Sequence, residues 1–353
     1  MIQDSFSDGR SISSDCVPDQ EVAVLKVSTA LGLTAAEIEH VIELAGLAPS
    51  LHNSQPWRFR VLPHVIELHY DPSHRLPATD PSERELRLAC GAALFNLRLA
   101  LEGAGVRPVV TLLPHLAEPT VLAEIRSGGR AEPRPERLRL RDAIPKRHSH
   151  RAPFRDIPVP AADRNQMLHA AQAEQCWLHL ITPGEVGPLE GLVHRAHRVQ
   201  EASPRFRAEM AAWTGRPADV WEGVPASAAG PKPGPQDQWV HRDFSAGTAA
   251  RPEGLEYESH PLLAVLCSHR EGQEAELQAG QAAQHVWLTA TDRGLSASMI
   301  SEVIEVPDTR DELRQMLGGT LHPQALLRIG YGGGAAVPAP RRAVDDLILD
   351  DDT

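Results

Sequence analysis

The side chains best suited to chemistry gather in one loop, Ala48-Pro49-Ser50-Leu51-His52-Asn53-Ser54-Gln55-Pro56-Trp57. This loop presents amide, hydroxyl and imidazole groups between two prolines, and each proline fixes φ and biases the residue before it toward extended geometry. A rigid rim of neutral hydrogen-bonding groups suits a flat polar heterocycle better than a metal or a phosphate. The alternative is a structured turn that ends a helix and begins a strand.

A second polar segment, Lys146-Arg147-His148-Ser149-His150-Arg151, is the densest cationic cluster in an acidic chain. Guanidinium groups pair bidentately with phosphate, and a serine hydroxyl adds one more donor. The alternative is a solvated charged surface at the head of a domain. Two adjacent arginines near the C-terminus, Arg341-Arg342, are weaker evidence of the same kind.

Both segments resemble the nitroreductase superfamily. The pattern Pro49-Ser50-x-x-Asn53-Ser54-Gln55-Pro56-Trp57 is similar to the flavin-edge signature of that family, and Arg147-His148-Ser149-x-Arg151 matches its phosphate-binding segment. The resemblance implies non-covalent FMN at the interface of two similar subunits. It assigns the flavin edge to Pro49, Ser50, Asn53 and Gln55, and the phosphate to Arg147, His148, Ser149, Arg151, Arg341 and Arg342.

A third segment, Ser298-Met299-Ile300-Ser301, follows the second long helix that we predict below. The resemblance places it along the isoalloxazine ring, near N5 and O4, and so assigns Met299, Ile300 and Ser301 to the flavin. The family often has Pro and Glu or Gly here, so Met299 and Ser301 are departures. Backbone groups can still supply the hydrogen bonds to the ring.

Several elements must position these residues. Thr34-Ala35-Ala36-Glu37 reads as a capping box, which predicts a helix that begins there and ends at Gly46. The arginine- and proline-rich segment 126–146 reads as a linker. We further predict strands at 58–62, 65–70, 106–113, 177–181 and 261–268, long helices at 83–103 and 274–293, and a helix from Ala161.

The two long helices look like copies of each other. Gly91-x-Ala93-x-x-Asn96-Leu97 aligns with Gly280-x-Ala282-x-x-His285-Val286, and the neighbouring elements repeat in the same order. The chain thus resembles the Acg-like branch of the superfamily, from about residue 31 to residue 349. We expect an α+β fold, a nitroreductase-like three-layer α/β/α sandwich in which two fused half-repeats form a pseudo-dimer. The predicted division is a disordered tail (1–20), a first half (21–125), the linker (126–146) and a second half (147–349).

The two halves do not carry the same motifs. The first has the Asn53/Gln55 loop but no Arg-x-Ser-x-Arg segment before it, and the second has the cationic segment but Gln172–Cys176 in place of the loop. The resemblance implies that each flavin takes its phosphate contacts from one subunit and its edge from the other. We therefore expect one complete site, a single FMN, and a monomeric pseudo-dimer.

Residues 198–258 form a predicted insertion in the second half. A short helix at 204–213 precedes a stretch rich in Gly and Pro, 223–235, that cannot hold regular structure. The aromatic residues of the insertion need an apolar surface, so we predict a lid over the flavin site, with a stretch such as 223–247 crossing the ring. The alternative is a surface excursion that packs elsewhere.

Composition narrows the class of protein. The 353 residues are 42% hydrophobic and 23% charged, as in a soluble globular protein, and the net charge of −12 argues against nucleic acid or an anionic membrane as partner. No signal peptide or membrane-spanning run is visible, and the tail 350–353 should be disordered. Four dispersed cysteines, Cys16, Cys90, Cys176 and Cys267, form no CxxC pair. Three of them lie in apolar runs, which indicates reduced core thiols in a cytoplasmic protein.

Other constellations are weaker. His194-x-x-His197 with Glu201 could hold zinc on one helical face, but clustered histidines are common in a chain with 17 of them, so we predict no metal. Gly330-Tyr-Gly-Gly-Gly334 precedes no helical pattern, so a Rossmann loop is excluded.

The predicted function is an FMN-dependent oxidoreductase of the nitroreductase type. Hydride would pass from NAD(P)H through the flavin to a small-molecule acceptor, a quinone or a nitro compound, and no side chain is expected to act as an acid or base. The alternative is a non-catalytic protein that binds and sequesters FMN beneath the lid.

Overall fold

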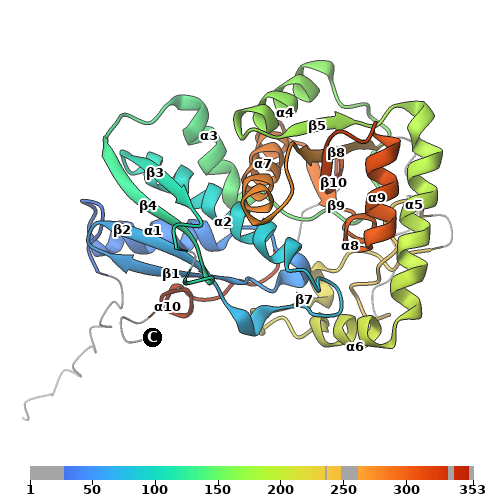
Figure 1. Cartoon of the computed structure of the whole chain (residues 1–353), viewed down its shortest axis with the longest axis horizontal. Coiled ribbons are helices and arrows are strands. Elements are labelled where there is room, and N and C mark those ends of the chain that lie inside the picture. Colours follow the sequence, from blue (N-terminus) through green and yellow to red (C-terminus); the bar gives the residue numbers. More distant parts are fainter. Residues whose placement is uncertain (1–27, 116, 235–236, 248–260, 333–337, 350–353) are drawn as a thin grey trace, which may run out of the picture.

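The computed structural model describes residues 28–115, 117–234, 237–247, 261–332 and 338–349. Two four-stranded sheets lie on either side of a central layer of helices (Figure 1). The predicted tails 1–20 and 350–353, and Cys16, lie outside the described residues. Cys90, Cys176 and Cys267 are buried free thiols. In the described part of the chain, every helix is too short or too polar to cross a membrane.

The internal duplication is visible in the strand order. The first half contains α1 (Ala35–Gly46), β1 (Trp57–Leu62), β2 (Val65–Tyr70), α2 (Arg84–Gly103), β3 (Val106–Leu112) and β4 (Val121–Arg130). The second half repeats this sequence of elements with α4 (Ala161–Ala173), β5 (Trp177–Leu180), β8 (Leu262–Ser268), α7 (Gln273–Asp292), β9 (Ser296–Met299) and β10 (His322–Gly330). The sheets are ordered β1-β2-β4-β3 and β5-β8-β10-β9, so in each half the fourth strand lies between the second and the third.

The predicted capping box of α1 is confirmed. The Thr34 hydroxyl accepts from the Glu37 amide at 3.3 Å, and the Glu37 carboxylate accepts from the Thr34 amide at 2.8 Å. The helix then buries Ile38, Val41 and Ile42 against the core of the first half. Because α1 ends at Gly46, it positions the loop that begins at Ala48 at the centre of the molecule.

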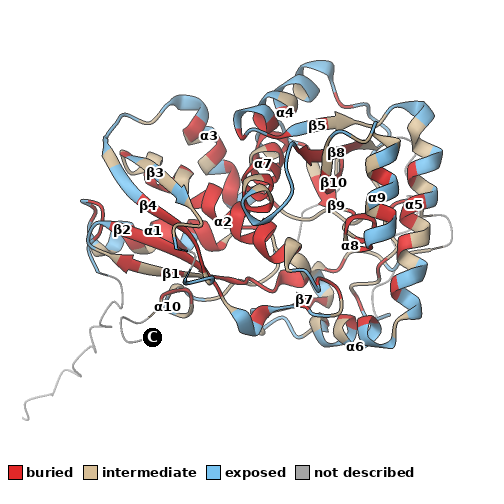
Figure 2. Ribbon diagram, viewed as in Figure 1, coloured by how far each residue is buried: buried red, intermediate tan, exposed pale blue. Residues whose placement is uncertain are grey.

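The second sheet lies between two helical layers. On its outer face pack α5 (Pro183–Ala202), α8 (Glu302–Glu305) and α9 (Pro307–Met316), which share a hydrophobic cluster with alternate residues of β8 and with Leu326 of β10. Buried residues are concentrated on the central helices and on the strands that face them (Figure 2). The remaining short elements are α6 (Pro204–Trp213), β6 (Thr214–Arg216), β7 (Val224–Pro225) and α10 (Val344–Leu347), with 3-10 turns at Leu51–Asn53, Pro72–His74, Ile144–Lys146 and Ala226–Ala228.

Two segments differ from the prediction. Residues 126–146, expected as a linker, hold the end of β4 and the helix α3 (Pro135–Ala143), which packs against α2 and α7. The insertion in the second half also begins before residue 198, because helix α5 directly follows strand β5. The first half has only the two-residue turn Pro63-His64 at the corresponding place. The α6 boundaries agree with the prediction, and part of the Gly/Pro-rich stretch does form the short strand β7 and a 3-10 turn.

The two central helices approach each other at the glycines that the internal repeat aligns. A Cβ atom added to Gly91 on α2 would lie 2.2 Å from the carbonyl oxygen of Leu277, and one added to Gly280 on α7 would lie 2.1 Å from that of Leu88. Nearby, the buried Gln284 amide donates to Asn96 at 2.8 Å, and Asn96 donates to the Leu44 carbonyl at 3.1 Å. The repeated glycines are therefore what lets the two halves pack at this distance.

Gly91→Ala should destabilise the protein by about 1–3 kcal/mol, because the clash is with backbone and no side-chain rotation relieves it. Thermal or urea unfolding checks this. The matched control is Gly191→Ala in α5, where an added Cβ meets nothing within 4 Å, so the change should be neutral or stabilising by up to ~1 kcal/mol. Equal stability of the two variants would contradict this account of the helix contact.

Candidate functional site

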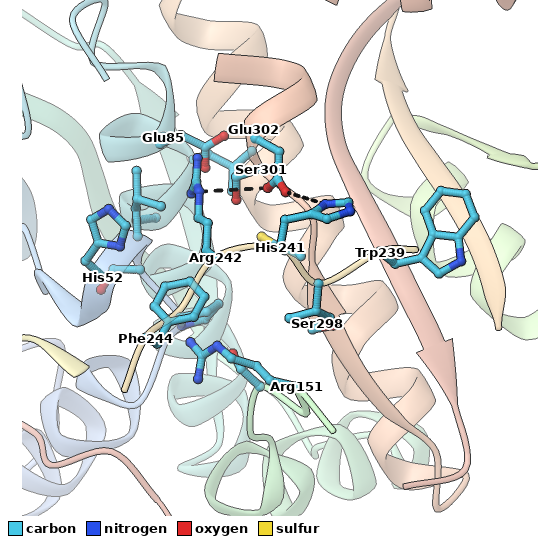
Figure 3. Close-up of a pocket in the computed structure, with 18 of the residues that line it drawn as sticks. His52, Glu85, Arg151, Trp239, His241, Arg242, Phe244, Ser298, Ser301 and Glu302 are labelled. Carbon is cyan, nitrogen blue, oxygen red and sulfur yellow. Dashed lines mark ion pairs between the residues drawn. The ribbon is translucent and has the colours of Figure 1, made fainter. Parts of the chain in front are cut away.

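A cavity opens between the two halves, at the C-terminal end of α1. The loop after α1 forms one wall, α2 and α7 form the floor, and β9 and the segment Trp239–Phe244 of the insertion close the rest (Figure 3). Its empty space, including the open mouth, is about 790 Å³. Its lining includes Pro49, Ser50, Leu51, His52, Glu85, Leu88, Ala89, Ser149, Arg151, Trp287, Ser298, Met299, Ser301 and Glu302.

A smaller and more polar pocket adjoins the cavity and shares four residues with it: Pro49, Ser50, Ser149 and Arg151. Its other lining residues bring together four distant parts of the chain. They are Asn53, Arg147, His148, Val224, Ala228, Ala339 and Arg341. This lining contains three arginines and no carboxylate.

Arg147 is the most deeply buried of these cations, with 4% of its surface exposed. Its Nη2 donates to the Leu47 carbonyl at 3.3 Å, and its guanidinium lies over the Trp287 ring at 4.8 Å. Among the described residues, its Nε and Nη1 have no hydrogen-bond partner. Burial, together with the nearby charge of Arg341, lowers the pKa of Arg147 to about 9. Two strong donors in the pocket are thus left for a ligand.

Arg341 and Arg151 complete the cluster and are half-buried. Arg341 donates to the Asn53 side-chain oxygen at 2.6 Å, while Arg151 donates to the Ala228 carbonyl at 2.9 Å. Burial lowers the pKa of each to about 10. Within the described ranges, neither these two nor Arg147 forms an ion pair with Asp or Glu, and unpaired buried cations are costly. A ligand with several anionic oxygens, such as a phosphate, would compensate all three.

The loop that borders both spaces has an unusual backbone. His52, Asn53 and Gln55 adopt φ values of 52°, 56° and 49°, in the left-handed region that favours glycine. Their surroundings hold them there: the Asn53 amide donates to the carbonyls of Trp221, Gly223 and Pro340 at 3.0–3.2 Å. Strain of this kind persists where the fold enforces it, and it clusters at functional sites.

Comparisons with known proteins identify the family of this chain. Residues 263–331 match the family model described as "Nitroreductase family". A Mycobacterium tuberculosis protein named "Putative NAD(P)H nitroreductase Rv3131" is 33% identical over 319 residues, which span 89% of this chain and 91% of that one. The chain belongs to the nitroreductase family. A second relative from the same organism, "Putative NAD(P)H nitroreductase acg", is 32% identical over 90% of this chain and 96% of its own length.

Solved structures of the family are more distant. A nitroreductase with bound FMN from Desulfitobacterium hafniense has a TM-score of 0.39 and 12% identity, and the match covers 60% of this chain and 97% of that one. A second one with bound FMN, from Bacteroides fragilis, has a TM-score of 0.35 and 16% identity, over 56% and 91% of the two chains.

Most residues that the nitroreductase resemblance assigned to the flavin do line one of the two spaces. The cavity is lined by Pro49, Ser50, Ser149, Arg151, Met299 and Ser301. The smaller pocket is lined by the first four of these and also by Asn53, Arg147, His148 and Arg341. Asn53 therefore lies on the arginine side, and its amide is already used by the insertion and the C-terminal segment. The spacing of these residues in the sequence could not have shown which of them line the cavity and which line the smaller pocket.

Three assigned residues lie outside both spaces: Gln55, Ile300 and Arg342. The Gln55 amide donates to the Trp221 carbonyl at 2.6 Å and accepts from the Arg342 backbone at 3.0 Å. Ile300 is buried in the core of the second sheet. The Arg342 guanidinium lies 3.8 Å from both Asp71 and Glu222, so its charge is balanced by carboxylates. The contact of these three residues with a flavin therefore stays a prediction.

The insertion contributes residues that sequence reasoning did not single out as site residues. Arg242 lines the cavity and is held by Gln200 at 2.7 Å and by Glu305 at 3.2 Å. Although burial opposes it, the charges of Glu305 and Glu302 raise the pKa of Arg242. This buried network anchors the segment that borders the cavity, as Figure 3 shows for Arg242 and Glu302.

Glu85, in the first turn of α2, was also missed. It is buried and lines the cavity, and burial, reinforced by the charges of Glu305 and Asp80, raises its pKa well above the ordinary value. In the sequence it resembles any acidic residue at the start of a helix. Only the packing of the other half and of the insertion removes it from water.

The weak zinc alternative gains no support. His194 and His197 pack near the ring of His241, with centroids 4.4 and 5.3 Å away. Over the described ranges, the only group of three ligand atoms within 4.8 Å of one another is elsewhere, at Glu67, His115 and Glu124. There the Glu124 carboxylate already accepts from His115 at 3.0 Å and from Arg126 at 2.9 Å. We propose no metal at either place.

Proposed function

We propose that this chain is an FMN-dependent oxidoreductase that transfers hydride from NAD(P)H to a quinone or a nitro compound. The observation that carries the proposal is the cluster of Arg147, Arg151 and Arg341, which has no carboxylate and adjoins a partly aromatic cavity. The names of the relatives, which specify NAD(P)H, and the FMN in the family's solved structures support it.

The residues present fit FMN. The arginine pocket, with the Ser149 hydroxyl, would hold the phosphate, since Arg147 and Arg341 have donor atoms without partners among the described residues. Pro49, Ser50, Met299 and Ser301 would border the ring in the adjoining cavity. When bound, FMN supplies the hydride chemistry, while the protein supplies binding, orientation and positive potential.

The insertion would act as a lid in this arrangement. Its residues Trp239–Phe244 line the cavity opposite the loop after α1, and Phe244 lies beneath the Arg151 guanidinium at 4.2 Å. The anchoring of Arg242 in a buried ion-pair network favours a second candidate function, a protein that sequesters FMN without turnover. The two functions share one site and differ in whether a nicotinamide can reach it.

A spectrum and a reduction experiment separate them. Purified protein should show flavin absorbance in the visible range. Anaerobic NADPH or NADH should bleach it if the chain is a reductase, and a quinone should restore the colour. Persistent colour with both donors, in protein that dithionite does reduce, would favour sequestration. Absence of bound flavin after incubation with FMN would reject both candidates.

One FMN per chain is the expected stoichiometry. Near the end of α4, which corresponds to α1 in the first half, Arg98 donates to Glu174 and to Gln281, each at 2.7 Å. Phe95 and His285 stack nearby at 4.8 Å. Because Glu174 already balances the charge of Arg98, this guanidinium does not need a phosphate as a partner. Flavin released by heat, quantified against protein, should give a ratio near one in a monomer, and a saturated ratio near two would contradict the single site.

A further inference from the structure

His52 is an orphaned polar side chain inside the cavity. Only 3% of its surface is exposed, and among the described residues neither ring nitrogen has a hydrogen-bond partner. Its ring lies 6.1 Å from that of Phe244, in a tilted arrangement, and Figure 3 shows it on the cavity wall that faces Arg242. It occupies a variable position of the Pro49-Ser50-x-x-Asn53 pattern, so the family resemblance gave it no role.

The fold retains His52 at an energetic cost, because a buried polar group without a partner forfeits its hydrogen bonds to water. Its φ of 52° lies in the left-handed region, which histidine adopts more often than most other non-glycine residues. A ligand that hydrogen-bonds to the ring would offset the cost of burying its nitrogens.

The chemistry of the site indicates what kind of ligand this is. Burial, with the charges of Arg242 and Arg151, lowers the pKa of His52 well below its ordinary value. The ring is therefore neutral near pH 7 and offers one N–H donor and one acceptor. A neutral donor in a cavity that also contains Arg151 and Arg242 suits an uncharged carbonyl or nitro oxygen that gains electron density.

We propose that His52 binds the electron acceptor, by donating a hydrogen bond to the reducible oxygen of a quinone or nitro compound. This deepens the proposed function and rests on it. His52 is a binding residue here, and no proton transfer is assigned to it. The neighbouring insertion residues would enclose the same molecule, because Phe244 and Arg242 line the cavity beside His52.

The test compares His52→Phe, which keeps a flat ring without nitrogens, with His52→Asn, which keeps a donor and tolerates left-handed φ. The acceptors are tetramethyl-1,4-benzoquinone, which must bind in the cavity, and ferricyanide, which accepts electrons without such a hydrogen bond. For the quinone, His52→Phe should raise KM about fivefold to tenfold, and His52→Asn should recover part of the loss. The ferricyanide rate, the FMN content and the rate of reduction by NADPH should not change.

A second readout does not depend on the flavin. Tetramethyl-1,4-benzoquinone should quench the fluorescence of Trp239 and Trp287, which line the cavity, in FMN-free protein. The dissociation constant should rise by the same factor in His52→Phe, even if the parent proves not to retain FMN and the proposed function fails. An unchanged KM together with an unchanged dissociation constant would overturn the proposal. Loss of FMN from folded His52→Phe would overturn it too, by making His52 a flavin ligand.

Discussion

Replacing Arg147 and Arg341 together by methionine should lower the affinity for FMN by about two to four orders of magnitude. Each guanidinium would lose charge-assisted hydrogen bonds of ~1.5–3 kcal/mol, which is one to two orders of magnitude per residue. Arg147→Ala or Arg151→Ala alone should show the single-residue effect. Fluorescence titration of FMN-free protein with FMN measures this. The control is Arg164→Met, since Arg164 is exposed on α4 and lines neither the cavity nor the adjoining pocket.

In FMN-free protein, Arg147→Met alone should increase the stability of the folded state. Burial, with the nearby charge of Arg341, lowers the pKa of Arg147 from its ordinary value to about 9 in the folded state, so folding favours its neutral form. Below pH 9 the destabilisation is therefore present in full, and it fades as the pH rises above 9. Arg147→Met should melt higher than the parent at pH 7 without FMN, and this advantage should shrink at pH 10. A lower melting temperature at pH 7 would show that the Leu47 hydrogen bond and the Trp287 contact outweigh the cost of burying the cation, and that the pocket is not built for an anion.

Arg242→Ala should destabilise the protein by about 3–5 kcal/mol, because it leaves the buried carboxylates of Glu302 and Glu305 without their cation. The matched variant Arg242→Met with Glu305→Met removes one charge of each sign and should recover much of this loss. Urea unfolding of both proteins, alongside the parent, measures the difference.

The matched variant also tests the lid. Without the Arg242 anchor, the segment Trp239–Phe244 should leave the cavity more readily, so reduction by NADPH should become faster and FMN easier to wash out. Deletion of residues 214–258 with a flexible linker should have a larger effect of the same sign, and it keeps α5 and α6, which cover hydrophobic surface. Unchanged reduction and FMN retention in both folded variants would place the insertion outside the access route.

The sequence by itself determined the features that local rules control. The Thr34/Glu37 capping box depends on residues three apart, and the boundaries of β2 and α6 follow from turn residues and a proline at the first helical position. The duplication was visible because Gly91 and Gly280 occupy equivalent places, and the two sheets then share one strand order. The motifs also identified ten residues that line the cavity or its adjoining pocket.

Only the tertiary structure decided which of these residues line the cavity or its adjoining pocket. Arg341 and Arg342 are adjacent in sequence, yet one enters a pocket without carboxylates while the other meets Asp71 and Glu222. The burial of Glu85 and the isolation of His52 likewise depend on contacts with elements far along the chain. A motif specifies the identity and spacing of side chains, but the charge and hydration around each one arise from distant segments that pack beside it.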